Sequence, residues 1–165
     1  MRRIMSIVIL IILLLSLTGC QQEEAELVHP VQLFYCSKTV NFHLEDGLFA
    51  SEVREFDSWE NKPREFLNEY LAGPVSPDLV SPFPVGGWII ELSKKGKNVN
   101  VVLNINFTRL SPNELSTACA CLSMTIFELM DAESVQIETS GYNTDQSVIL
   151  MTRDNLLFSD NSDLN

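Results

Sequence analysis

The sequence has little positive charge. Lysine and arginine number 11 against 22 aspartate and glutamate residues, so the 165-residue chain has a formal net charge of −11 at pH 7. Arg2 and Arg3 are the only charged residues before Cys20, and the chain from Cys20 onward carries −13. Such a surface repels phosphate, so we expect no nucleic-acid partner. It also repels anionic lipid headgroups, so any attachment to a membrane must be hydrophobic or covalent.

Patterns of residues that carry catalysis or bind metals are missing too. The chain has two histidines, His29 in an acidic polar stretch and His43 in a polar loop. It contains no Gly-x-Ser-x-Gly nucleophile motif, no His-Glu-x-x-His zinc motif and no glycine-rich phosphate loop. We therefore predict that the protein is not an enzyme and that it uses no metal or cofactor.

Long hydrophobic runs are limited to residues 4–17, which follow two arginines. This run has 14 residues, fewer than the roughly 20 that span a bilayer. It ends in Leu17-Thr18-Gly19-Cys20, and this order is typical of a bacterial secretory signal. The last four residues resemble the lipobox of bacterial lipoproteins, which implies cleavage before Cys20 and lipidation of its sulfur. The alternative is a transmembrane anchor that is retained, but an acidic flank without a positive cluster disfavours it.

These features predict the organisation of the chain. Residues 1–19 are expected to be a signal peptide, and residues 20–30 an acidic tether running from the lipidated Cys20. Residues 31–153 have the length and composition of a single domain. Residues 154–165 are acidic and are expected to form a flexible tail.

Hydrophobic periodicity predicts an α+β domain. Strong helix signals lie at 62–72, where Pro63 fits the first turn, and at 111–130, where Ser111 and Glu114 can form a capping box. The order of elements predicts a two-layer sandwich in which two helices pack on one mixed β-sheet. The expected strands are 31–36, 48–56, 88–93, 98–104, 133–139 and 147–152.

Three cysteines remain once Cys20 is assigned to lipid. Cys119 and Cys121 lie two apart on the second helix, so they point in different directions and cannot easily share a metal. We expect Cys119 on the buried face of this helix, where it is able to meet Cys36 of the first strand. Buried apolar packing is the favoured interpretation for these thiols. A disulfide is the alternative, and a metal ligand or nucleophile is least favoured.

Residues 73–87 form a long loop rich in proline, and they include Phe83 between Pro82 and Pro84. Proline restricts the backbone in advance, so such a loop loses little entropy when it docks on another surface. Two interpretations stay open. Phe83 either folds back into the core, or Phe83 or Trp88 anchors a neighbouring subunit or a partner protein.

An ordered set of segments lies between about residues 31 and 141. They are Val31–Tyr35, Leu71–Pro74, Ser81–Ile90, Val99–Asn104 with Phe107, and Val135–Ile137 with Gly141. In this order they resemble the sporulation and spore germination (GerMN) domain. Family members commonly carry Asp where this chain has Val102 and Ser near Asn104, so the resemblance does not extend to that polar pair.

The resemblance implies a fold similar to ring-building motifs, display on the outer face of the bacterial cytoplasmic membrane, and no catalytic residues. We therefore expect a lipid-anchored interaction module of the cell envelope, linked to sporulation or germination. Its expected partners are the membrane, through Cys20, and envelope proteins, with self-association as one form. The alternative is a lipoprotein that binds a small ligand, which would need a pocket with convergent polar groups.

Overall fold

The computed structural model describes residues 29–39, 48–56, 59–141 and 148–156. The predicted signal peptide, most of the tether, Cys20 and His43 lie outside these residues. The strands are β1 (His29–Ser37), β2 (Phe49–Phe56), β3 (Leu79–Val80), β4 (Ile89–Lys95), β5 (Asn98–Leu103), β6 (Ser134–Thr139) and β7 (Val148–Thr152). The helices are α2 (Pro63–Leu71), α3 (Pro112–Met130) and the single turn α4 (Arg153–Leu156), with 3-10 turns η1 (Trp59–Asn61) and η2 (Ile105–Arg109).

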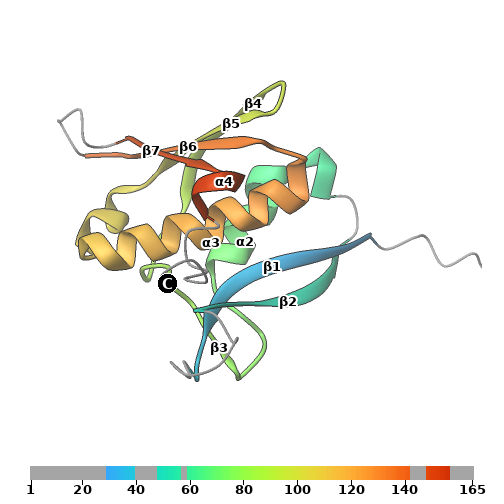
Figure 1. Cartoon of the computed structure of the whole chain (residues 1–165), viewed down its shortest axis with the longest axis vertical. Helices are drawn as coiled ribbons and strands as arrows, with labels where there is room; N and C mark the ends of the chain where they lie inside the picture. The colour runs from blue at the N-terminus through green and yellow to red at the C-terminus, as the bar shows by residue number, and fades with distance from the viewer. Residues whose placement is uncertain (1–28, 40–47, 57–58, 142–147, 157–165) are drawn as a thin grey trace, which may run out of the picture.

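The strands form two sheets, and the helices lie between them (Figure 1). Strands β4, β5, β6 and β7 form a mixed sheet in that order, with β5 and β6 parallel and the other pairs antiparallel. The order β2-β1-β3 forms a smaller antiparallel sheet. The α+β class and the packing of two helices on a mixed sheet are confirmed.

The placement of the first strands differs from the prediction of one sheet. Strand β1 does not join the mixed sheet, because its alternating apolar residues pack on the helices from the opposite side. Val31, Leu33 and Tyr35 are buried, whereas Gln32 between them is exposed. The helices are therefore covered on two sides, and the domain has three layers instead of two.

Helix α3 begins as the sequence predicts. The Ser111 hydroxyl accepts a hydrogen bond from the Glu114 N–H at 3.4 Å, and the Glu114 carboxylate accepts one from the Ser111 N–H at 2.8 Å. The apolar face of this helix is buried, apart from half-buried Leu115. Thr125, outside that face, is also fully buried. It is buried where β1 lies against the helix, and its hydroxyl accepts a hydrogen bond from the Phe34 N–H at 3.0 Å.

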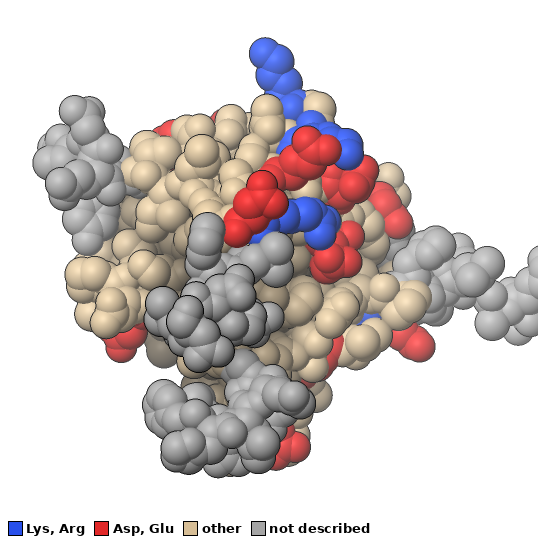
Figure 2. Space-filling model, viewed as in Figure 1, with Lys and Arg blue, Asp and Glu red and all other residues tan. Residues whose placement is uncertain are grey.

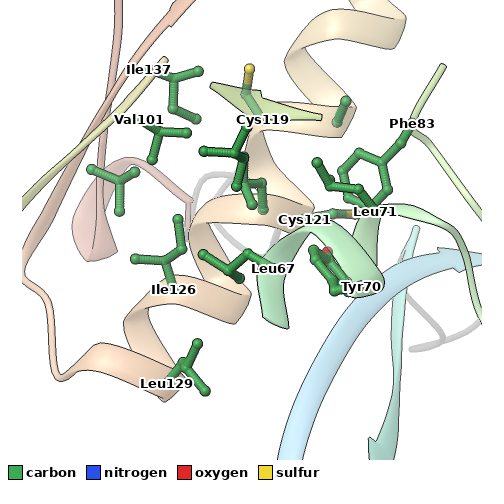
Figure 3. Packing of buried hydrophobic residues seen from close by; sticks show 14 of the residues in the cluster. Leu67, Tyr70, Leu71, Phe83, Val101, Cys119, Cys121, Ile126, Leu129 and Ile137 are labelled. Carbon is green, nitrogen blue, oxygen red and sulfur yellow. The ribbon is translucent and has the colours of Figure 1, made fainter. Parts of the chain in front are cut away.

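Residues from both helices and both sheets meet in one core (Figure 3). Leu67 and Tyr70 of α2 lie beside Ile126 of α3, and Val101 and Ile137 come from the mixed sheet. Each is at most 1% exposed, and full burial of such a side chain contributes about 1.5–3 kcal/mol.

The ends of the domain extend slightly beyond the predicted limits. His29, assigned to the tether, is the first residue of β1. At the other end α4 includes the first residues of the predicted tail, and the Arg153 guanidinium donates to the Phe127 carbonyl of α3 at 2.9 Å. Among the described residues, no helix has both the length and the apolar character needed to cross a membrane.

Candidate interaction surface

The structure separates the two aromatic residues that the sequence proposes for partner contact. Phe83 is only 8% exposed, and its ring packs edge-on against Tyr70, with ring centroids 5.0 Å apart. Of the two interpretations left open by the sequence, Phe83 therefore folds back into the core. Trp88, five residues later, is 52% exposed. Of the pair, it is Trp88 that lies where another protein can reach it.

The first half of the 73–87 loop is fixed by two charged residues of β2. The Glu52 carboxylate accepts hydrogen bonds from the backbone N–H groups of Val75 at 3.1 Å and Ser76 at 2.8 Å. The Arg54 guanidinium donates to the Gly73 carbonyl at 2.7 Å and forms an ion pair with Glu52. Because both side chains are mostly buried, this pair ties the loop firmly to the small sheet.

The environment of Glu52 favours its charged form. Partial burial raises the pKa of the carboxyl, but the hydrogen bonds from Ser76, Val75 and Arg54 together outweigh burial and leave the pKa below its ordinary value. The loop is therefore held by an ionised carboxylate at neutral pH. It also contains the two-residue strand β3, paired with β1, which the sequence analysis did not identify.

The second half of the loop is fixed by a buried asparagine. Asn104 is 3% exposed, and its amide donates to the Gly86 carbonyl at 2.9 Å and accepts from the Trp88 N–H at 3.3 Å. Gly87 lies against the buried ring of Phe107, and a Cβ atom there would sit 2.9 Å from Cε2 of that ring. The backbone beneath Trp88 is thus tightly positioned by residues that follow β5.

Apolar side chains form a rim around the Asn104 clamp, the hydrogen bonds by which Asn104 holds Gly86 and Trp88. Hydrogen bonds from Asn104 and Asn106 to the Gly86 carbonyl join two segments, residues 83–90 and 102–108, and neither contains a charged residue. Large hydrophobic side chains on these segments stay in solvent although the backbone is ordered. They are Val85 at 97% exposure, Trp88 at 52%, Ile90 at 44% and Ile105 at 60%.

Few charges lie near the rim on the face in view in Figure 2, although η2, which carries part of the rim, ends in the exposed Arg109. Figure 2 shows many of the lysine, arginine, aspartate and glutamate side chains of this face gathered toward the β4–β5 turn. On the side where η2 lies, most of the described surface in view is uncharged. An exposed apolar surface of this kind is typical of a site of protein contact.

A second candidate feature is an open hollow of about 390 Å³ between the end of β2 and α2. Phe56, Trp59 and Phe66 form its aromatic wall, and Lys62, Glu65 and Glu69 supply charged groups. Its volume lies at the low end of the range for small-molecule sites, about 300–1,000 Å³. This hollow is where the small-ligand alternative has a physical site.

The thiols offer little for catalysis. Burial raises the pKa of the Cys119 thiol to about 12, so it stays protonated and is a poor nucleophile at neutral pH. Cys119 lies on the side of Val101 and Ile137, whereas Cys121 lies on the side of Tyr70 and Leu71 (Figure 3). Within the described ranges, no group of three or more histidine, cysteine, aspartate or glutamate side chains is placed to hold a metal ion.

No family model and no curated protein matches the sequence of the chain. Comparison with solved structures does find similar folds. The tandem GerMN domains of the sporulation protein GerM from Bacillus subtilis superpose with a TM-score of 0.57 at 18% identity. The match covers 76% of this chain and 44% of that one, so this chain spans less than half the length of the GerM structure. A Clostridium perfringens protein described as a candidate lipoprotein is matched at 15% identity over 78% of this chain and 91% of that one. Its TM-score of 0.42 is too low to support a shared fold. The chain therefore has a GerMN-like fold.

Proposed function

We propose that this protein is a non-catalytic, membrane-tethered interaction module of the bacterial envelope, linked to sporulation or germination. The observation that carries the proposal is the apolar rim around Trp88, exposed on a backbone that Asn104 holds in place. A binding surface whose backbone is already ordered loses less entropy on association. The GerMN-like fold supports this assignment, because the GerM structure that shares the fold belongs to a sporulation protein.

The tether is proposed to begin at Cys20, lipidated after the sequence Leu17-Thr18-Gly19. One acyl chain holds a protein only marginally, whereas two or more give stable anchoring. A lipidated Cys20 would place the domain on the outer face of the cytoplasmic membrane. There the rim is available to other envelope proteins or to a second copy of the chain.

The tether is tested by Cys20→Ser. We expect this variant to lose lipid labelling and to leave the membrane fraction, because serine lacks the sulfur to which the lipid would be attached. If Cys20→Ser still sediments with membranes, the lipoprotein assignment is wrong.

The rim is tested by comparing Trp88→Ala with Val53→Ala. Val53 is 64% exposed on β2, outside the rim, so its truncation controls for loss of an exposed apolar side chain. In detergent extracts of membranes, the wild-type protein and Val53→Ala should elute from a sizing column as a complex. Trp88→Ala should elute at the size of the free chain with an unchanged melting temperature. Equal elution of all three proteins would remove the rim from consideration.

The second candidate function is capture of a small ligand in the hollow beside Trp59. Acidic residues next to aromatic rings favour a ligand that carries an amine or quaternary ammonium group. The chain has two tryptophans, so Trp88→Phe leaves Trp59 as the sole tryptophan, whose fluorescence is read with excitation at the red edge that tyrosine does not absorb. Saturable quenching of that variant by tetramethylammonium, absent in Trp59→Phe, would support the ligand function. No saturation in either variant would reject it for this class of ligand.

A further inference from the structure

Cys36 belongs to β1 and Cys121 to α3, and the fold brings the two residues together although they are 85 positions apart. Each thiol perturbs the pKa of the other. From the sequence, Cys119 is the cysteine of this helix expected to be able to meet Cys36. Cys119 points toward the mixed sheet instead (Figure 3).

The closeness of the two residues follows from how β1 lies on α3. The Phe34 N–H donates to the Thr125 hydroxyl at 3.0 Å, which fixes one point of contact between strand and helix. Two residues further along the strand is a step of about 6.6 Å. Four residues back along the helix is a step of about 6 Å. Cys36 lies two residues after Phe34, and Cys121 lies four residues before Thr125. The two steps are similar in length, so the packing of β1 on α3 places Cys36 beside Cys121.

The same contact is reinforced from α2. The Tyr70 hydroxyl donates to the Phe34 carbonyl, and the Tyr35 hydroxyl donates to the Tyr70 carbonyl at 3.0 Å. Tyr70 is fully buried. The position of β1 just before Cys36 is therefore specified by hydrogen bonds to both α3 and α2.

The two thiols differ in access and acidity. Cys36 is half-buried, whereas Cys121 is fully buried. The neighbouring Cys121 thiol lowers the pKa of Cys36, while the Cys36 thiol and burial raise the pKa of Cys121. Cys36 is thus the thiol that a small molecule meets first and the one that ionises first.

We propose that Cys36 and Cys121 are a site of oxidation that forms a disulfide between β1 and α3, with a small organic disulfide as the oxidant. Cys36 loses its proton, and its thiolate attacks one sulfur of the oxidant and expels the other as a thiolate that takes up a proton. Cys121 then loses its proton and attacks the Cys36 sulfur of this mixed disulfide, which breaks that bond and forms the protein disulfide. Two protein thiols are oxidised, and the oxidant is reduced to two small thiols.

In the cell this cross-link rests on the proposed location outside the cytoplasmic membrane, because disulfides persist in oxidising compartments. The bond closes a long loop, so it restricts the unfolded chain strongly. A rise in melting temperature of about 10 °C or more is expected for a loop of this size in a domain of this length.

The test uses the full-length chain with Cys20→Ser, purified in detergent under reducing conditions. This background leaves three of the four cysteines, Cys36, Cys119 and Cys121. The protein is exposed to oxidised glutathione, alkylated, digested with trypsin and mapped by mass spectrometry. Cys119 and Cys121 fall in one tryptic peptide, 110–153, so a matched Cys119→Ala variant assigns the linked sulfur.

We expect a cross-linked peptide pair that has lost two hydrogens, present both in this background and with Cys119→Ala added. We also expect reductant to lower the melting temperature of both proteins by about 10 °C or more and to leave Cys36→Ala unaffected. Free, alkylated Cys36 and Cys121 after oxidation would overturn the proposal. A Cys36–Cys119 link, or a lasting glutathione adduct on Cys36, would overturn it as well. Because the assay uses purified protein, its result is independent of whether the chain is found at the membrane.

Discussion

Glu52 shows how one side chain can fix a loop that carries a surface. Its carboxylate takes the N–H groups of Val75 and Ser76 and pairs with Arg54, and it is only 11% exposed. The folded pKa of Glu52 is lower than the ordinary value of 4.5. The stabilisation is therefore fully present above about pH 4.5 and is lost as the pH falls through the folded value.

We predict that Glu52→Gln lowers the free energy of unfolding by about 1–3 kcal/mol at neutral pH, because a neutral amide loses the ion pair and satisfies the loop N–H groups less well. The difference from the wild type should shrink as the pH falls below 4.5. Urea unfolding at several pH values measures it, and Glu55→Gln, an exposed carboxylate on the same strand, is the control. Parallel pH curves for the wild type and Glu52→Gln would contradict this role.

Asn104 has the equivalent role at the other end of the loop. Truncation to Ala leaves the Trp88 N–H without its acceptor and the Gly86 carbonyl with only the Asn106 amide. We predict a loss of about 1–3 kcal/mol in the free energy of unfolding. Asn106→Ala removes a bond to the same carbonyl from a less buried position, so its loss should be smaller. If the two variants unfold at the same urea concentration, the clamp does not depend on Asn104.

At the scale of elements, local signals account for what could be predicted. Ser111, Pro112 and Glu114 mark the start of α3 because capping depends on residues within one turn. Alternating apolar residues give β5, and the lysines and glycine at 94–97 give the turn before it. Short-range chemistry thus suffices for most strand and helix positions.

The second sheet could not be predicted in this way. Thr125 is a polar residue outside the apolar face of α3, and contact with β1, about 90 residues earlier, buries it. Phe83 and Trp88 are similar aromatic residues in one loop, so composition alone does not tell which enters the core. Phe83 is buried because its ring packs on Tyr70. Trp88 stays exposed on a backbone that the Asn104 clamp holds in place.

The contact between β1 and α3 is tested by Thr125→Val, which keeps the shape of the side chain and removes its oxygen. The Phe34 N–H would then be left without a partner, at a cost of about 1–3 kcal/mol in the free energy of unfolding. Thr117→Val is the matched control, because the Thr117 hydroxyl bonds only to the Asn113 carbonyl of its own helix at 2.9 Å. Equal stability of the two variants in urea would mean that Thr125 does not fasten the sheet.

At the scale of the whole molecule, three layers share one core and leave an apolar rim exposed beside η2. Helices α2 and α3 lie between the two sheets, so few apolar residues of the helices reach solvent (Figure 1). Four of the exposed large apolar side chains lie where the loop meets η2, on the rim around Trp88, and others lie on β2, β7 and the first half of the loop. An exposed apolar surface on an ordered backbone favours contact with another protein.

The central proposal, that a partner protein binds at the rim, is tested most directly in living cells. A photo-crosslinking phenylalanine derivative is placed at position 88 or, as a control, at position 53. The natural residue at the control position, Val53, is 64% exposed. Irradiation should join the membrane-bound protein to a partner or to a second copy from position 88 and not from position 53. Folded, membrane-bound protein that gives no cross-link from position 88, or equal cross-links from both positions, would contradict the account.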